Sequence, residues 1–124
     1  LNLSLRDAAR FGQMLLQQGV WQGEQVIPAA AVASISGGGD PEKFSGAGYK
    51  TLPGGSYRSQ WWALHNENGA YSARGIHGQA IYIDPVAEMV IARFATFPIS
   101  FNAAIDPTSL PAYQAVADYL IKKP

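Results

Sequence analysis

Two apolar segments joined by a short polar turn constrain the fold of this chain more than any other feature. GIHGQAIYI spans residues 75–83, a turn with Asp84 and Pro85 follows, and MVIARFATF spans residues 89–97. Runs of this length with so short a link predict an antiparallel β-hairpin. Because the second segment is apolar at nearly every position, we expect both of its faces to be covered.

Helical segments are predicted on both sides of this hairpin. Residues 4–18 carry an apolar stripe at helical spacing, with Ser4 as the expected N-cap and Gly19 as the expected left-handed end. A shorter helix is expected over residues 28–35, where a proline suits the first turn. The last helix is expected over residues 109–123, which end in two lysines that complement the helix dipole.

An aromatic segment and a glycine-rich loop complete the expected order of elements. YRSQWWAL, residues 57–64, predicts a third strand, and HNENGAYSA, residues 65–73, a polar turn. Residues 36–56 hold seven of the 13 glycines and show no periodicity, which predicts a loop. A loop of that length inside a domain is typically functional or mobile. The expected fold class is α+β, a three-stranded antiparallel sheet with flanking N- and C-terminal helices.

Composition excludes several classes of function. The 124 residues include nine basic and nine acidic side chains, so no nucleic-acid or anionic-membrane partner is expected. No apolar run reaches the ~18 residues of a membrane span. Cysteine is absent, and the two histidines, His65 and His77, are not at metal-ligand spacing, so no metal site is expected. The opening at Leu1, without Met or signal segment, predicts a single partial domain over residues 1–124 of a longer protein.

The start of the segment GIHGQAIYI is the candidate site. If it is a strand, His77 and Gln79 point to one face, and Gly78 and Ala80 to the other. The small Gly78 and Ala80 would let a ligand approach the backbone, and an accessible N–H there could stabilise a developing oxyanion. Three plainer interpretations remain open: His77 as an ordinary hydrogen-bonded strand histidine, Gly78 as a bulge, and Gln79 as a partner of a loop carbonyl.

Four further side chains have a structural and a functional interpretation. Trp61 and Trp62 are expected in the core, and because they point to opposite faces at most one could face a cleft. His65 is expected to be solvated in its polar turn. Arg74 either binds a substrate carboxylate or, as we expect, forms a surface salt bridge.

The order of these motifs resembles the serine hydrolases of the β-lactamase and penicillin-binding-protein type. The similarity lies in LSLRDAARFGQMLLQQGVWQGEQVIP, YRSQWWAL, GIHGQAIYIDP and EMVIARFATFP, and it extends over the whole chain. Within that family the chain looks most like the branch of 6-aminohexanoate-dimer (nylon-oligomer) hydrolases and esterases, near the class C β-lactamases. The resemblance implies the C-terminal part of a β-lactamase/transpeptidase-like fold and a small-molecule amide or ester substrate, cleaved through an acyl-enzyme without a cofactor.

The family's third active-site motif, Lys-Thr-Gly or a variant, implies roles for four residues. His77, Gly78 and Gln79 fall on the three motif positions and would line the substrate pocket. Ala80 falls on the next residue, whose backbone N–H forms half of the oxyanion hole. A bulky Gln79 in place of glycine suits an amide hydrolase better than a β-lactamase.

The family's other two motifs are missing from the sequence. No serine has a lysine three residues later, and SFN at residues 100–102 follows the third motif instead of preceding it. Without a nucleophile and a base an acyl-enzyme cannot form, so we expect this chain alone to be inactive and to need the remainder of its own chain as partner. A β-lactamase or D,D-peptidase parent, or a non-catalytic binding module derived from the fold, are the alternatives.

Overall fold

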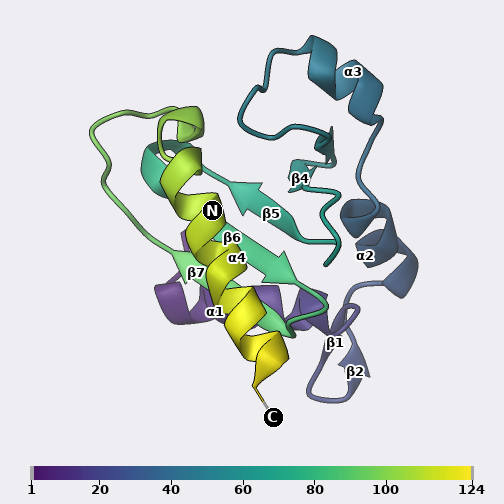
Figure 1. The fold of residues 1–124 in the computed structure, drawn as a ribbon. Helices are drawn as coiled ribbons and strands as arrows, with labels where there is room; N and C mark the ends of the chain where they lie inside the picture. Colours follow the sequence, from purple (N-terminus) through teal and green to yellow (C-terminus); the bar gives the residue numbers. More distant parts are fainter. Residues whose placement is uncertain (1, 124) are drawn as a thin grey trace.

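The computed structural model, which describes residues 2–123, shows a five-stranded antiparallel sheet between helices (Figure 1). The strand order is β3-β4-β5-β6-β7, so each strand pairs with the next one in the chain, and β1 and β2 form a separate hairpin. The elements are α1 (Leu5–Leu16), β1 (Val20–Trp21), β2 (Glu24–Gln25), α2 (Ala29–Ser36), α3 (Pro41–Gly46), β3 (Ser56–Arg58), β4 (Trp61–Ala63), β5 (Tyr71–Arg74), η1 (Ile76–Gly78), β6 (Ala80–Asp84), β7 (Met89–Arg93), η2 (Asn102–Ala104) and α4 (Asp106–Lys122).

The sheet buries a separate apolar cluster on each face. On one face, Tyr71 and Ile83 pack with Leu15 of α1 and with α2. On the other face, Tyr82 packs with Ala117 of α4, the helix drawn in yellow in front of the sheet in Figure 1. Successive side chains of β6 therefore pack alternately into the two clusters. The fold is α+β as predicted.

The predicted N-cap of α1 is confirmed. The left-handed turn that ends the helix begins at Gln18, one residue before the predicted Gly19. The Ser4 hydroxyl accepts the Asp7 N–H at 3.2 Å. At the other end Gln18 already has a φ of +56° and Gly19 follows at +84°. The Gln18 N–H bonds to the Leu15 carbonyl and the Gly19 N–H to the Met14 carbonyl, which is the Schellman pattern with Gln18 in the left-handed position.

The sheet has five strands, so the prediction of three was wrong. The predicted strand over residues 57–64 is divided at Ser59 and Gln60, whose φ values of +50° and +68° form a tight hairpin between β3 and β4. The predicted polar turn over residues 65–73 contains most of β5. Its Tyr71 is buried against the α1 and α2 cluster, which shows that burial outweighed the polar composition of the segment.

The predicted β6–β7 hairpin is confirmed, with shorter strands. Its register pairs Ala80 with Arg93 and Asp84 with Met89. Both faces of β7 are covered, because Val90 packs toward α1 and Met89 toward α4.

Helix α3 and the start of α4 lie where helix was not predicted. Inside the predicted loop over residues 36–56, the Asp40 carboxylate accepts the Glu42 N–H at 2.9 Å and the Lys43 N–H at 3.3 Å, and a proline occupies the first turn of α3. Helix α4 begins at Asp106, three residues before the predicted start, with another proline in its first turn.

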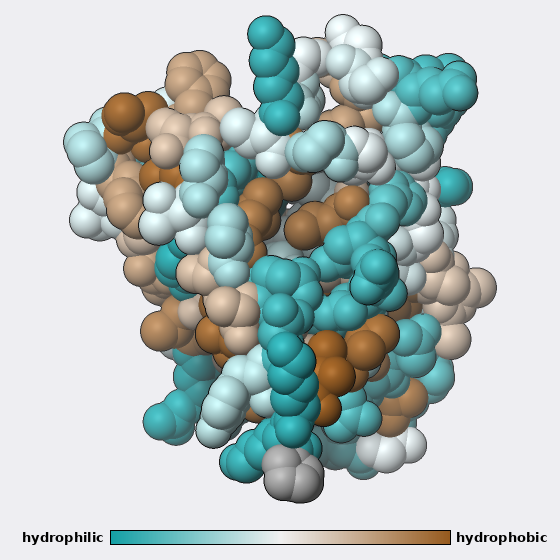
Figure 2. All heavy atoms as spheres, viewed as in Figure 1, coloured by the Kyte–Doolittle hydropathy of each residue, from teal (hydrophilic) through white to brown (hydrophobic). Residues whose placement is uncertain are grey.

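The segment between β7 and α4 exposes apolar side chains. Phe101 is 76% exposed and Ile99 54%, and Figure 2 shows brown, apolar surface over this segment at the upper left. Within residues 2–123 no helix is long and apolar enough to span a bilayer.

Candidate functional site

The chain between β5 and β6 is a turn, so the predicted strand over residues 75–83 was wrong at its start. Ile76–Gly78 form a single 3₁₀ turn in which His77 has a φ of +55° and Gly78 one of +87°. These left-handed conformations are incompatible with a strand. The period of two therefore does not apply before Ala80, and His77 and Gln79 do not share a strand face.

His77 anchors the turn to the segment that follows β7. Its N–H donates to the Ser100 carbonyl at 3.2 Å, its carbonyl accepts the Phe97 N–H at 3.2 Å, and its Nδ1 lies 2.7 Å from the Phe97 carbonyl oxygen. His77 lines none of the cavities near the turn. The geometry matches the plainer interpretation, a histidine with satisfied hydrogen bonds.

Gly78 is required by a close approach, as predicted, but the approaching group belongs to the same chain. A Cβ at this position would lie 2.3 Å from a ring carbon of Phe97. The Arg93 guanidinium donates from Nε to the Gly78 carbonyl at 2.7 Å and from Nη1 to Ser109 at 2.7 Å. Gly78 therefore packs the turn against β7 and α4.

The Gln79 side chain is held by the backbone of Ala95. Its Nε2 donates to the Ala95 carbonyl, and its Oε1 accepts the Ala95 N–H at 3.3 Å. Of the two interpretations open for Gln79, the loop-carbonyl contact is the one that the structure shows.

Ala80 is the first residue of β6, and the strand register determines toward which neighbouring strand its N–H points. Ala80 lies opposite Arg74 on β5 and opposite Arg93 on β7. The Gly75 N–H bonds to the Gln79 carbonyl at 2.9 Å, so Gly75 and Gln79 are a hydrogen-bonded pair. In an antiparallel ladder the neighbouring pair, Arg74 and Ala80, is then not bonded. The Ala80 N–H, predicted to stabilise an oxyanion, consequently faces β7.

Strand β5 has a free end on its other side. The Leu64 N–H bonds to the Ala70 carbonyl, so Leu64 and Ala70 are a hydrogen-bonded pair of the β4–β5 ladder. In an antiparallel ladder every second residue bonds to the neighbouring strand, so the backbone groups of Ser72 and Arg74 point toward β4. The ladder stops after Ser72, because the next partner, Gln60, lies in the β3–β4 hairpin turn.

Unpaired backbone groups result at this free end. Within residues 2–123, no hydrogen-bond partner is found for the N–H or carbonyl of Arg74, or for the N–H of Ile76. The Gly75 carbonyl between them accepts from the Asn102 amide at 3.1 Å.

A cavity of about 940 Å³ opens beside the free end of β5. Trp62 lines it, with its ring centroid 4.6 Å from that of Tyr57, whereas Trp61 is buried in the core. The prediction that at most one tryptophan could face a cleft is therefore confirmed. The lining residues are Asn2, Leu3, Ala8, Tyr57, Gln60, Trp62, Ala73, Arg74, Gly75, Gln79, Ala80, Ile81 and Phe94.

The side chain of Arg74 is fixed by a buried ion pair, so the expected surface salt bridge was wrong. Its Nη2 bonds to Asp106 Oδ1, and the two side chains are only 8% and 5% exposed. Thr51 donates to the other carboxylate oxygen at 2.5 Å. The guanidinium carbon also lies 5.8 Å from the centroid of the Trp62 ring. These contacts join α4, β5 and β4 beside the cavity.

His65 is exposed, as expected, and it also pairs with a serine. His65 Nε2 lies 2.7 Å from Ser56 Oγ, which also accepts the Gly39 N–H at 2.9 Å. A serine beside a histidine is the pattern of an activated nucleophile. Ser56 has no exposed surface and lines none of the cavities near β5, so this pair stabilises the loop and does not offer a nucleophile.

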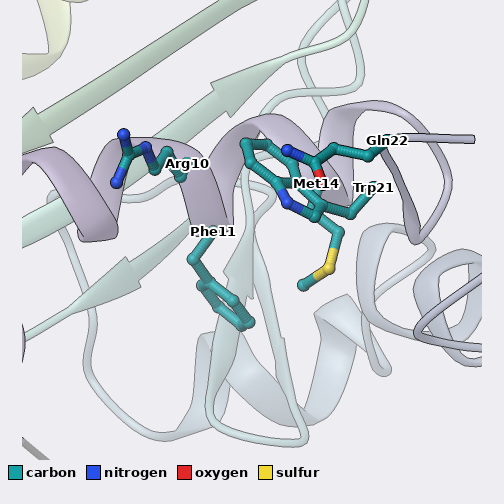
Figure 3. A pocket seen from close by; sticks show the side chains of 5 residues that line it. All are labelled: Arg10, Phe11, Met14, Trp21 and Gln22. Carbon is teal, nitrogen blue, oxygen red and sulfur yellow. The ribbon is translucent and has the colours of Figure 1, made fainter. Parts of the chain in front are cut away.

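A smaller cavity of about 460 Å³ lies on the outer side of α1 (Figure 3). Arg10, Phe11 and Met14 of α1 line it, together with Trp21 and Gln22 of the β1–β2 hairpin. The Arg10 guanidinium is paired with Asp7 at 2.9 Å. None of the four predicted site residues lies there, and the candidate site is therefore the cavity at the free end of β5.

Hydrogen bonds with Ser4 and Arg10 lower the pKa of the exposed Asp7, and the other groups with a shifted pKa are tyrosines in or beside the two cores. Burial raises the pKa of Tyr71 and of Tyr82 to about 12, with the charge of Asp84 adding to the effect at Tyr82. In the part of the chain that the structure describes, no three His, Asp or Glu side chains are grouped so as to hold a metal ion.

Comparisons with known proteins find relatives that are named as hydrolases. No family model matches it. The 6-aminohexanoate-dimer hydrolase of Paenarthrobacter ureafaciens is 38% identical over 99 residues, which are 79% of this chain. A solved structure from Bacillus anthracis, provisionally given the same enzyme name, superposes with a TM-score of 0.79 at 37% identity and covers 99% of the chain.

The chain is homologous to part of the 6-aminohexanoate-dimer hydrolases. It spans 25% of the length of the curated relative and 30% of the solved chain.

Proposed function

We propose that this chain forms one wall of the substrate cleft of a serine hydrolase that cleaves amide or ester bonds through an acyl-enzyme. The observation that carries the proposal is the free end of β5. Arg74, with an unpaired backbone N–H and carbonyl, lines a cavity of about 940 Å³, and Ile76, with an unpaired N–H, lines a neighbouring cavity of about 220 Å³ that Arg74 also borders. The relatives named as hydrolases support it.

The backbone groups fit the needs of acyl transfer. A tetrahedral intermediate requires N–H donors aimed at its oxyanion. The N–H groups of Arg74 and Ile76 are unpaired and flank Gly75, so they are better placed for this role than the Ala80 N–H, which faces β7. The Arg74 carbonyl would accept from an N–H of an extended substrate, as a sheet edge accepts an added strand.

The nucleophile and the base would come from residues outside this chain. The sequence has no Ser-x-x-Lys, and the buried Ser56 is out of reach. Gln79 and Ala80 would line the cleft, while His77 and Gly78 would shape the turn behind it.

A chimaera tests the proposal. The segment of the Paenarthrobacter ureafaciens enzyme that matches this chain is replaced by the chain, and hydrolysis of the 6-aminohexanoate dimer is measured. We expect an active chimaera. Replacing Ile76 by proline then removes one N–H with little change of shape, because Gly75 before it has φ −108° and ψ 169°, which proline tolerates.

The expected loss of kcat in the Ile76→Pro chimaera is roughly 10²–10³-fold, the range for one oxyanion donor. Ile76→Ala keeps the N–H and is the matched control, with near-normal turnover. Equal turnover in the proline and alanine variants would refute the assigned donor, and an inactive but folded chimaera would refute the proposed function.

A non-catalytic binding module is the second candidate, favoured by one observation. Ile76, Ile99 and Phe101 are all more than half exposed near the same end of the sheet. Apolar surface of this kind promotes association. Sedimentation of the chain over a range of concentrations separates the two: a soluble monomer that binds a defined protein favours the module, and self-association favours an incomplete enzyme.

A further inference from the structure

We infer that Asn102 is a positioning residue for acyl transfer, because its side-chain amide fixes and polarises the peptide group that carries the Ile76 N–H. The inference rests on the proposed function, from which it takes Ile76 as the oxyanion donor. Asn102 is the last residue of SFN at residues 100–102, a segment that the proposed function leaves without a role.

Asn102 contacts the same peptide group that carries the proposed donor. Its Nδ2 donates to the Gly75 carbonyl at 3.1 Å, and that carbonyl and the Ile76 N–H belong to one planar group. In a trans peptide the carbonyl and the N–H point in opposite directions. Because Asn102 holds the carbonyl, the Ile76 N–H is directed away from Asn102. Within residues 2–123 this N–H has no partner.

The segment that contains Asn102 also fixes the chain before and after Ile76. The Ser100 carbonyl accepts the His77 N–H at 3.2 Å. Asp106, at the start of α4, forms the buried ion pair with the side chain of Arg74. The direction of the Ile76 N–H is therefore determined by contacts from residues 100–106 on both sides of it.

Asn102 is itself held in place before any substrate binds. Its side chain is half-buried, and its carbonyl accepts the Ile105 N–H at 2.8 Å within η2, which is followed directly by α4. It lines the cavity of about 220 Å³ together with Gly75 and Ile76. A donor that is oriented in advance needs no reorganisation when the oxyanion develops, which is the condition for effective electrostatic stabilisation.

The hydrogen bond from Asn102 has two effects on the Ile76 N–H. It fixes the direction of the N–H, and it strengthens the N–H as a donor, because hydrogen bonds along a chain of peptide groups polarise one another. Both effects act on charge that appears only in the transition state. A loss of Asn102 should therefore lower kcat and leave KM nearly unchanged.

Turnover of the chimaera with the Paenarthrobacter ureafaciens enzyme tests this expectation. Asn102→Ala should lower kcat roughly three- to tenfold, the value of one hydrogen bond, with KM within about twofold. Asn68→Ala is the matched control, because its amide donates a partly buried hydrogen bond to Asp84 at 2.8 Å in the loop between β4 and β5. The control should keep its kcat. A raised KM with unchanged kcat in Asn102→Ala, or equal kcat in the two variants, would overturn the inference.

A double-mutant cycle tests whether Asn102 acts through the Ile76 N–H. In the Ile76→Pro chimaera this N–H is absent, so adding Asn102→Ala should cause no further loss of kcat. A further loss of roughly three- to tenfold would show that Asn102 acts elsewhere, and would overturn the inference while Ile76 remains the donor. Equal turnover of Ile76→Pro and Ile76→Ala would overturn the proposed donor and the inference together, as would an inactive but folded chimaera.

A measurement on the ¹⁵N-labelled chain itself does not depend on activity. The ¹⁵N signal of Ile76 responds to the hydrogen bond at the Gly75 carbonyl, because the two groups share one polarisable peptide. We expect this signal to move in Asn102→Ala and to stay in place in Asn68→Ala. An unmoved Ile76 signal in Asn102→Ala would overturn the inference whatever the chimaera does.

Discussion

Replacing Asp106 by alanine should destabilise the chain strongly, because it leaves the Arg74 guanidinium buried without its anion. The two side chains are 8% and 5% exposed, so water replaces the lost carboxylate poorly. Removing one partner of a buried pair costs about 3–5 kcal/mol. The hydrogen bond from Thr51 is lost as well, which adds about 1 kcal/mol. We therefore expect the free energy of unfolding to fall by about 4–6 kcal/mol.

Urea unfolding measures this loss, with the fluorescence of Trp61 and Trp62 in β4 as the signal. Lys43→Ala is the control, because its ion pair with Asp40 is solvent-exposed and should contribute less than about 1 kcal/mol.

A double variant, Arg74→Met with Asp106→Leu, separates two quantities. One is the net contribution of the ion pair to the free energy of unfolding, and the other is the destabilisation caused by removing only one partner. Apolar replacements of a buried ion pair are often neutral or stabilising by about 1–4 kcal/mol. The double variant should therefore be far more stable than Asp106→Ala. A loss below about 1 kcal/mol for Asp106→Ala would show that Arg74 finds solvent easily, and would refute the description of a buried pair.

Three further predictions follow from burial. Gly78→Ala should destabilise the chain by about 2–4 kcal/mol, because its Cβ would lie 2.3 Å from an aromatic ring. Gly69→Ala, also at positive φ but in open space, should cost only about 1 kcal/mol, and chemical denaturation compares the two variants. Ser56→Ala should cost about 1–3 kcal/mol, because it leaves the half-buried Gly39 N–H and the His65 ring without their partner. Thermal unfolding at matched scan rates checks this, and an unchanged midpoint would contradict it. The pKa of Tyr71 and of Tyr82, raised to about 12, predicts full stability below pH 10, the unfolded value, and a loss as pH rises through 12; unfolding at several alkaline pH values tests this, and replacement of both tyrosines by phenylalanine should flatten the curve.

The spacing of apolar residues along the sequence predicted the helices and strands whose buried side chains recur at a regular helical or strand period. The apolar stripe and the Ser4 cap predicted α1, and the apolar segments before and after Pro85 predicted the β6–β7 hairpin. It failed where a strand is short and partly polar. Tyr71–Arg74 contains a serine and an arginine, and only its position opposite β6 makes it a strand.

The structure places a cavity beside the predicted site segment, but the contacts within that segment differ from those expected. The glycine in GIHGQ indicated a close approach, but the sequence does not reveal that the approaching ring is Phe97. The free end of β5 depends on where the β4 ladder stops, at Gln60, which no local pattern encodes. The partner of Arg74 lies 32 residues away and could not be predicted from spacing.

That same separation determines when the cavity can assemble during folding. Strands β3 to β7 pair in chain order, so the sheet is made of local contacts that can form early. Asp106 reaches Arg74 only when α4 has docked on the finished sheet. We therefore expect the contact between Arg74 and Asp106, beside the free end of β5, to form last. Hydrogen exchange near Gly75 should report the opening of α4, a helix that begins next to the cavity and extends away from it.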